Sequence, residues 1–278
     1  MTAPRVQRPD PASPADRHGE SGDRYARYPS LRDAVVLISG GASGLGAEFV
    51  AQFAAQGARV GFVDVAVDAG EELVAAVAER GQPRPLFREC DIRDLDAYRR
   101  VIAEIAAELG DVQVLVNNAG SDTRHAVADV VPAYWDERMR VNLDHQFFAA
   151  QAVAPAMRAA GRGSIINMGS ISAHVDLLDL TAYMTAKAGI EGLTRSLSRE
   201  FGPDGVRVNC VLPGWIMTAR QLEHWMNPEA DAHRAAAQAL PQRLEPADVA
   251  RLVLWLAADD SRSCTGQHWV VDGGWMHS

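Results

Sequence analysis

Four side chains in this sequence could together carry acid/base chemistry: Asn142, Ser170, Tyr183 and Lys187. Tyr183 and Lys187 are four positions apart, so on a helix they would lie on one face, one turn from each other. A lysine ammonium at that distance favours the phenolate, which lets the tyrosine act as a base near neutral pH. Lowering a tyrosine pKa from about 10 to about 7 takes roughly 4 kcal/mol of differential stabilisation. The spacing therefore predicts a proton-transfer site centred on Tyr183.

A glycine-rich segment near the start of the chain predicts a site for a dinucleotide pyrophosphate. Gly40, Gly44 and Gly46 follow the apolar run 35–38 and precede a helical pattern. Glycines permit the tight turn and let backbone N–H groups and a helix N-terminus approach the phosphates. Combined with Tyr183 and its lysine, this segment predicts an oxidoreductase that transfers hydride.

Asp64 bears on the choice between the two nicotinamide dinucleotides. It stands at the end of the second apolar run, eighteen residues after Gly46. A carboxylate there accepts hydrogen bonds from the adenosine ribose hydroxyls and repels a 2′-phosphate. The neighbouring residues supply no cation that would reverse this preference; they are Ser43, Leu45, Val65 and Ala66. The sequence predicts NAD as the cofactor, the alternative for Asp64 being a carboxylate that only closes a strand-end turn.

Asp91 and Ile92 follow the third apolar run. The Asp91 carboxylate could accept a hydrogen bond from the adenine amino group, with Ile92 packed on the ring. It could instead cap the next helix, where Asp is a favoured residue. Because one carboxylate accepts several hydrogen bonds, both roles could hold.

Seven short apolar runs alternate with helical patterns and define the elements that must position these residues. The runs cover 34–39, 59–64, 84–90, 112–117, 163–168, 206–212 and 269–271. The helical patterns cover 44–56, 68–80, 95–109, 133–160, 180–201 and 246–258. Seven β-branched runs separated by helices imply a parallel sheet with helices on both faces, an α/β fold of the doubly wound Rossmann type. Ligands of such sheets lie beyond the carboxyl ends of the strands, where the candidate residues fall.

The composition predicts a single domain over residues 29–278. Of the 278 residues, 47% are apolar and 23% are charged, which is enough apolar material for a large core. Residues 1–28 are rich in Pro, Asp, Arg, Ser and Gly, and we expect a disordered extension there because little apolar surface offsets the ordering entropy. The 27 basic and 36 acidic residues give a net charge of −9, which argues against nucleic acid or an anionic membrane as a partner.

Cysteine usage and the lack of targeting segments predict a cytoplasmic protein. No uninterrupted apolar stretch approaches ~18 residues, and the N-terminus lacks the apolar core of a signal peptide. Cys90, Cys210 and Cys264 are widely scattered, which is typical of buried thiols in a reducing cytoplasm. No spacing of Cys and His suggests a metal site.

The motifs, taken in order, resemble those of the short-chain dehydrogenase/reductase family. The matching segments are Gly40-x-x-x-Gly44-x-Gly46, Asn117-Asn118-Ala119-Gly120, Asn142, Ser170, Tyr183-x-x-x-Lys187 and Pro213-Gly214. The resemblance covers roughly residues 31–275. It implies a Rossmann fold of seven parallel strands and a nicotinamide-dependent oxidation of an alcohol or reduction of a carbonyl. Ser39 stands where threonine is commoner and Gly169 where a second serine is common, but the catalytic set keeps its hydroxyls.

The resemblance implies a role for each catalytic residue. Tyr183 would be the general acid/base that exchanges a proton with the substrate oxygen. Lys187 would lower the tyrosine pKa and hold the nicotinamide ribose hydroxyls, and Ser170 would position and polarise the substrate oxygen. Asn142 would hold the water that links Lys187 to solvent.

The same resemblance implies further cofactor contacts. Asn118 and Gly120 would form the cofactor-side loop after the fourth strand. After Pro213-Gly214, the backbone of Ile216 and the hydroxyl of Thr218 would anchor the carboxamide.

Within the family, the loop segments resemble bacterial aldose 1-dehydrogenases that act on D-xylose, L-arabinose or D-galactose. The similar segments are 28–31, 121–125, 134–138, 141–145, 170–174 and 186–192. This likeness implies NAD-linked oxidation of a pyranose sugar at C1 to the lactone. Ala173 stands where xylose-type relatives carry a large aromatic residue, so the pocket could accept a different or larger sugar.

A sugar ring presents many hydroxyls, so binding it requires several converging polar groups. We expect these to be Asp122, His125, His145, Ser172, His174 and Trp215, beside Ser170 and Tyr183. Each has an alternative: Asp122 and His125 could only tie down their loop, His145 could be a core histidine, and Trp215 could be a packing aromatic.

Two other functions remain open on the sequence alone. One is an NADH-dependent ketone or oxoacyl reductase, although the acidic composition offers no basic patch for a carrier protein. The other is a nicotinamide-sensing regulator without turnover, which the intact catalytic set argues against.

The family resemblance also implies a homotetramer, with a dimer as the second choice. Ile190, Leu193 and Leu197 recur at helical spacing and could serve the core, an interface or both.

Overall fold

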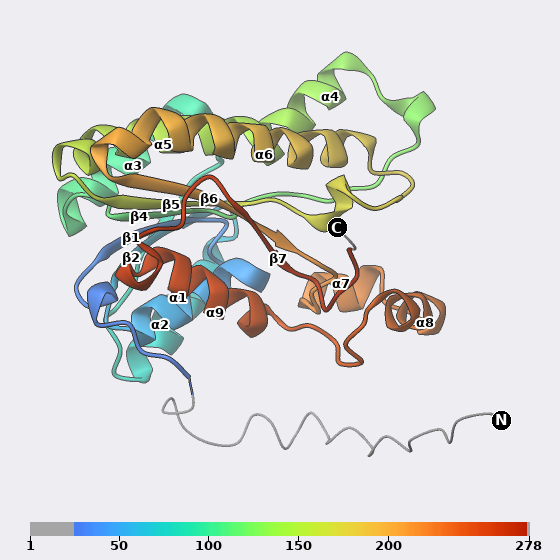
Figure 1. Ribbon diagram of the computed structural model, residues 1–278, viewed down its shortest axis with the longest axis horizontal. Helices are drawn as coiled ribbons and strands as arrows, with labels where there is room; N and C mark the ends of the chain where they lie inside the picture. The colour runs from blue at the N-terminus through green and yellow to red at the C-terminus, as the bar shows by residue number, and fades with distance from the viewer. Residues whose placement is uncertain (1–24, 277–278) are drawn as a thin grey trace.

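The fold is a seven-stranded parallel sheet with helices on both faces, as predicted (Figure 1). The computed structural model describes residues 25–276. The strands are β1 (Val35–Ser39), β2 (Arg59–Asp64), β3 (Leu86–Glu89), β4 (Val114–Asn117), β5 (Gly163–Met168), β6 (Val206–Pro213) and β7 (His268–Val271). Their order across the sheet is β3-β2-β1-β4-β5-β6-β7, and every neighbouring pair is parallel. The order in which strands are added to the sheet reverses between the neighbours β1 and β4, and such sheets bind ligands at this point.

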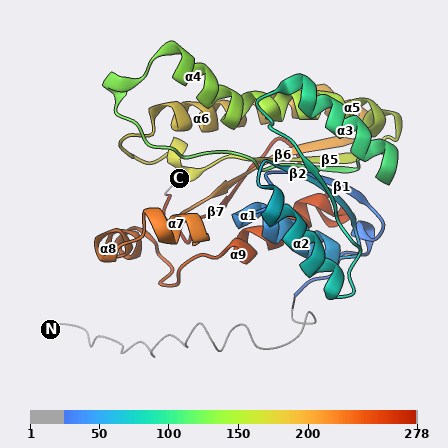
Figure 2. The same cartoon turned by 180° about the vertical axis from the view of Figure 1, so that it is seen from behind.

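Two layers of helices cover the sheet (Figures 1 and 2). One face carries α1 (Gly44–Ala55), α2 (Val67–Glu79) and α9 (Pro246–Ala257); the other carries α3 (Leu95–Leu109), α5 (His145–Ala159) and α6 (Thr181–Phe201). Because both faces are covered, the central strands β1 and β4 are buried at every residue. Each layer encloses its own apolar core, one around Phe49 and Phe53 and the other around Tyr98 and Ile105.

The helical pattern predicted at 133–160 is helical throughout, but a π-helical turn divides it. It forms α4 (Pro132–Met139), a π-helical turn (Arg140–Asp144) and α5. A π-turn inserts one residue into the helical ladder and often marks a functional site. Asn142 lies in this turn, fully buried.

Two helices are not predicted from the sequence: α7 (Ala219–His224) and α8 (Pro228–Ala237). Both start with side-chain caps, Thr218 accepting from the Gln221 N–H and Asn227 accepting from the Ala230 N–H. They lie together at one end of the molecule (Figure 1). Because they are short and polar, they lack the apolar stripe that would reveal them.

The boundary predicted at residue 29 falls inside a segment that already contacts the domain. The Tyr28 N–H donates to Gln56 Oε1 at 2.9 Å, and Gln56 Nε2 donates to the Ala26 carbonyl at 3.2 Å. The Arg251 guanidinium lies 3.8 Å from the centre of the Tyr25 ring. The rest of the predicted extension, residues 1–24, lies outside the described residues.

The structure shows the burial of the apolar stripe on α6 and of the three cysteines. Ile190 and Leu197 are buried and Leu193 packs against the core, so this stripe serves the core. Cys90, Cys210 and Cys264 are free thiols; the first two are buried and the third is partly exposed.

Within residues 25–276, no helix is both long and apolar enough to cross a bilayer. The same part of the chain has no cluster of three His, Cys, Asp or Glu side chains placed to hold a metal ion.

Candidate active site

A cavity of about 660 Å³ opens at the carboxyl ends of the strands and collects most of the predicted residues. Ser170, Tyr183 and Lys187 line it together. The predicted cofactor residues on its wall are Gly40, Ser43, Leu45, Asp64, Asp91, Ile92, Asn118, Gly120, Pro213, Gly214, Ile216 and Thr218. The predicted substrate residues on its wall are Asp122, Ser172 and Trp215.

The acid/base residues are fixed by α6 and by the turn after β5. Tyr183 and Lys187 lie one turn apart on α6, with the Lys187 Nζ 5.4 Å from the centre of the tyrosine ring. Lys187 is 3% exposed and donates from Nζ to the Met168 carbonyl at 2.7 Å. Ser170 begins the turn after β5, and its hydroxyl accepts the Ser172 N–H at 3.1 Å.

Burial is the strongest influence on both titrating groups. Withdrawal from water raises the pKa of Tyr183, the Asp122 carboxylate raises it further, and the Ser170 hydrogen bond opposes the rise. Burial lowers the pKa of Lys187 to about 8, against smaller opposing effects of Cys210 and Asp122. The sequence predicted that Lys187 pulls the tyrosine pKa down. In the protein alone, desolvation of the phenol dominates and raises its pKa.

The side chain of Asn142 faces the loop after β4 and does not line the cavity. Its Oδ1 accepts the Ser121 N–H at 2.8 Å, and its Nδ2 donates to the carbonyls of Ser121 at 3.2 Å and Arg138 at 3.0 Å. A Cβ built on Gly120 would lie 3.1 Å from Asn142 Oδ1 and 3.4 Å from Lys187 Nζ, which leaves no room for a side chain there. Asn142 therefore holds the loop that separates it from the lysine.

The glycine-rich turn fits a bound pyrophosphate. Gly40 and Gly44 have φ angles of +66° and +54°, which strain any other residue. A Cβ on Gly46 would lie 1.8 Å from the Gly40 carbonyl oxygen, so only glycine allows this packing. Gly44 and Gly46 thus shape the turn but do not themselves line the cavity. The N-terminus of α1 keeps free N–H groups toward the cavity because the Ser43 side chain does not cap it.

Ser39 contributes to the site, although the sequence indicated no role for it. Its hydroxyl accepts the N–H groups of Asn118 at 3.0 Å and Ala119 at 3.1 Å. Asn118 in turn donates from Nδ2 to the carbonyls of Ser39 at 3.0 Å and Gly40 at 2.9 Å. These bonds join the glycine-rich turn to the loop after β4, so any hydroxyl at position 39 would serve.

Asp64 lines the cavity and also closes a turn, as the alternative had it; its contact with a ribose stays a prediction. Its two oxygens accept the N–H groups of Ala42 at 2.9 Å and Ala66 at 3.0 Å. Carboxylate oxygens have further lone pairs that a ribose hydroxyl can use.

Asp91 does not cap α3, so that alternative is wrong: the cap is Asp94, which accepts the Ala97 N–H at 2.9 Å. Asp91 is held by Arg93, whose guanidinium lowers the pKa of the carboxyl and also contacts Glu137 at 3.0 Å. Arg93 also lines the cavity. It is a cation that the sequence argument for NAD did not consider, because that argument covered only the residues next to Asp64 and the glycine-rich turn. Its charge is paired with two carboxylates.

The far end of the cavity is bridged by a chain of hydrogen bonds to α7. Asp122 Oδ2 accepts from Gln221 Nε2 at 2.8 Å, and Gln221 Oε1 accepts from Trp215 Nε1 at 2.8 Å. Arg220 Nε also donates to Asp122, at 3.3 Å. The Trp275 ring stands 6.4 Å from that of Trp215, centre to centre. The sequence does not predict the cavity residues Arg220, Gln221, His233 and Trp275, because they come from the unpredicted helices and from the chain after β7.

Three predicted histidines are not among the residues that line the cavity, so their role as sugar ligands stays a prediction. His125 Nε2 accepts the Ala182 N–H at 3.4 Å, and its Nδ1 lies 3.0 Å from the Tyr134 hydroxyl, so it ties its loop to the start of α6. His145 is fully buried and donates from Nε2 to the Ala119 carbonyl at 3.1 Å. Burial lowers the pKa of His145 to about 3, with the charge of Lys187 contributing, so the ring is neutral. His174 turns to a carboxylate on α6.

Ser172, by contrast, lines the cavity with a hydroxyl that is buried and has no hydrogen-bond partner among residues 25–276. A buried hydroxyl without a partner is costly, so it suits a ligand that supplies one.

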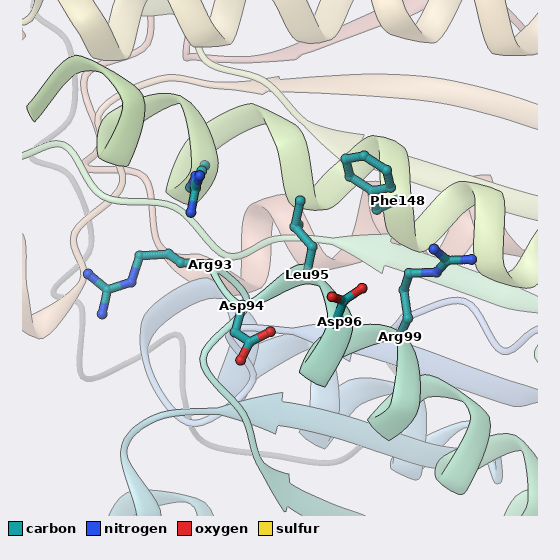
Figure 3. Close-up of a pocket in the computed structure, with 7 residues that line it drawn as sticks. Arg93, Asp94, Leu95, Asp96, Arg99 and Phe148 are labelled. Atoms are coloured by element: carbon teal, nitrogen blue, oxygen red, sulfur yellow. The ribbon is translucent and has the colours of Figure 1, made fainter. Parts of the chain in front are cut away.

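A second hollow of about 580 Å³ lies between the start of α3 and α5 (Figure 3). Its lining is Arg93, Asp94, Leu95, Asp96, Arg99, Arg140 and Phe148. None of the acid/base residues or glycines belongs to it, so the chemistry lies in the larger cavity.

Comparison with known proteins places this architecture in a family. Residues 40–276 match the family model described as enoyl-(acyl carrier protein) reductase. The chain is 53% identical over 250 residues to the D-xylose 1-dehydrogenase of Caulobacter vibrioides (strain NA1000 / CB15N), covering 90% of this chain and 98% of the relative. It is 45% identical over 249 residues to the "Probable galactose dehydrogenase GalD" of Rhizobium meliloti (strain 1021), covering 90% and 97%.

A solved structure shares the fold along nearly its whole length. The 3-oxoacyl-[acyl-carrier protein] reductase of Brucella melitensis with bound NAD superposes with a TM-score of 0.83 at 30% identity, covering 94% of this chain and 97% of that one. Sequence motifs, sheet order and relatives agree, and the chain belongs to the short-chain dehydrogenase/reductase family of oxidoreductases.

Proposed function

We propose that this enzyme oxidises a pyranose aldose at C1 to its lactone, with NAD as the hydride acceptor. One observation carries the proposal: Ser170, Tyr183 and Lys187 open into a cavity whose far end presents Asp122 and Trp215. Acid/base groups and a polar and aromatic wall in one cavity suit a polyhydroxylated ring. The identities of 53% and 45% to a D-xylose and a galactose dehydrogenase support a sugar substrate.

The chain's own residues account for the movement of the proton. The phenolate of Tyr183 takes the proton of the C1 hydroxyl, while Ser170, which lines the same cavity, orients that oxygen. Lys187 holds its ammonium beside the phenolate and stabilises it. As the O–H bond breaks, C1 loses its hydrogen with the bonding pair, and O1 becomes the lactone carbonyl. A bound oxidised nicotinamide supplies the acceptor for that hydride and a positive charge that favours the phenolate.

NAD rather than NADP is proposed because Asp64 faces the cavity and Arg93 is neutralised by its two carboxylate partners. A 2′-phosphate of about −1.5 to −2 charge beside Asp64 would be repelled. The wild type should prefer NAD by at least tenfold in kcat/KM, a gap of about 1.4 kcal/mol. Asp64→Ala should narrow that gap, with the exposed Asp68→Ala as the matched control. Equal kcat/KM with the two cofactors in the wild type would overturn this choice.

The substrate is tested by NADH formation with a panel of aldoses, with steroid and ketone controls. Free aldoses should be oxidised, and their methyl glycosides, which have no C1 hydroxyl, should be inert. If glycosides react as fast as free sugars, or no aldose gives NADH, the enzyme is instead a dehydrogenase or ketone reductase of another small substrate.

We also propose that the enzyme works in the cytoplasm and as a homotetramer. Three free cysteines suit a reducing compartment.

A further inference from the structure

A carboxylate on the catalytic helix is clasped by two histidines outside the cavity. Glu191 lies one turn after Lys187 on α6, with its side chain only 9% exposed. Its Oε1 is 2.6 Å from His174 Nε2, and its Oε2 is 3.2 Å from His268 Nδ1. None of the three residues lines the cavity, so the proposed chemistry does not use them directly.

His174 ends the short turn that begins with Ser170. The turn is a 3₁₀ helix (Ile171–Ala173) in which Ser170 accepts the Ser172 N–H at 3.1 Å and His174 donates its N–H to the Ile171 carbonyl at 2.8 Å. These bonds make residues 170–174 one stiff unit. Fixing His174 therefore fixes the direction from which Ser170 approaches Tyr183.

On the α6 side of the Glu191–His174 contact, the carboxylate is also held firmly. Tyr183, Lys187 and Glu191 recur every four residues, so they lie along one side of α6. A nearly buried carboxylate is stable only when paired, so Glu191 keeps its donors close. His268 at the start of β7 holds the second oxygen, which leaves the carboxylate in one orientation. The other ring nitrogen of His268, the buried Nε2, has no hydrogen-bond partner in the described part of the chain.

We propose that Glu191 is a positioning residue: through His174 it clamps the Ser170 turn to α6 and so sets the Ser170 hydroxyl against the Tyr183 phenol. Glu191 does not touch the reacting atoms and acts through Ser170. Its loss should lower kcat by about tenfold or more, since misplacement by 1 Å can cost about 100-fold. Affinity for NADH should change by less than about twofold, because the glycine-rich turn is distant in the fold from the clamp.

A double-mutant cycle tests the inference: wild type, Glu191→Ala, Ser170→Ala and the double variant, each assayed for kcat, KM and NADH binding. If Glu191 acts through Ser170, its removal costs about tenfold in the wild type and less than about twofold in the Ser170→Ala background. Glu191→Gln should restore most of the activity, because an amide can accept from His174 and donate to His268. Ser198→Ala, which removes a side-chain hydrogen bond from the same helix, is the matched control and should leave kcat unchanged.

Equal losses in both backgrounds, or no loss of kcat in Glu191→Ala, would overturn the inference. Where Glu191→Ala fails to fold, His174→Ala replaces it, because it leaves the Glu191–His268 pair in place. The inference rests on the proposed roles of Ser170 and Tyr183, so Tyr183→Phe is assayed alongside. Normal turnover in Tyr183→Phe refutes the proposed mechanism; an inactive Tyr183→Phe beside a fully active Glu191→Ala refutes only the clamp.

Discussion

Tyr183 carries the proton transfer in the proposed mechanism. Replacing it with phenylalanine keeps the ring and removes the hydroxyl, so kcat should fall by about 100-fold or more. NADH binding, measured by fluorescence titration, should remain within about twofold because the glycine-rich turn is untouched. A Tyr183→Phe enzyme with near-normal turnover would contradict the assignment.

Lys187 makes the stability of the fold depend on pH in a direction set by burial. Its pKa is about 8 in the folded chain, against an ordinary value of 10.5. Below pH 8, both folded and unfolded chains carry the charge, and the folded state bears the full desolvation cost. Between pH 8 and 10.5 the folded chain loses the proton first, so the free energy of unfolding rises with pH through this window. The gain should reach about 3 kcal/mol relative to Lys187→Met.

Urea unfolding of both proteins at pH 7 and pH 10 checks this difference. Lys187 is the only lysine in the sequence, so ¹⁵N-lysine labelling gives a single side-chain amine signal whose midpoint should lie near pH 8. A midpoint near 10.5 would show that the amine is not desolvated.

At the scale of elements, the central strands were predictable because they are apolar runs, rich in β-branched residues and largely buried on both faces, whereas the edge strands β3 and β7 are only partly buried. The site residues at their carboxyl ends followed from the same periodicity, as Asp64 and Ser170 illustrate. The π-helical turn at Arg140–Asp144 was not predictable, because the helical pattern continues through it and the contacts of Asn142 with Ser121 come from outside the helix. The pairing of His174 with Glu191 was not predictable for a similar reason, since the two residues are distant in the sequence.

Helix α7 offers a prediction at the same scale. Gln221 bridges Asp122 and Trp215, and replacing it with alanine removes both hydrogen bonds. At about 1 kcal/mol each, their loss should raise KM for the sugar by up to roughly thirtyfold and speed hydrogen exchange over residues 219–237. Glu223→Ala, an exposed change on the same helix, serves as the control. If hydrogen exchange over residues 219–237 is unchanged in Gln221→Ala, other contacts hold α7 in place.

At the scale of the whole molecule, the oligomeric state is a prediction still to be measured. The stripe of Ile190, Leu193 and Leu197 belongs to the core and so gives no support for an interface. Large apolar side chains remain exposed on the surface elsewhere, including Phe147 on α5 at 38% and Leu178 at 83%. Four chains of 30.0 kDa give 120 kDa, which light scattering should find for a tetramer. A mass near 30 kDa would exclude any stable assembly.

The single lysine has a consequence for how the protein withstands its proposed substrate. Reducing sugars condense with unprotonated primary amines, the reaction that glycates proteins. Arginine guanidinium groups stay protonated and are poor partners for a simple aldose. Among its side chains this protein offers such sugars one primary amine, and that amine is 3% exposed inside the catalytic cavity. An enzyme of this composition can work in concentrated sugar with no lysine on its surface to be glycated.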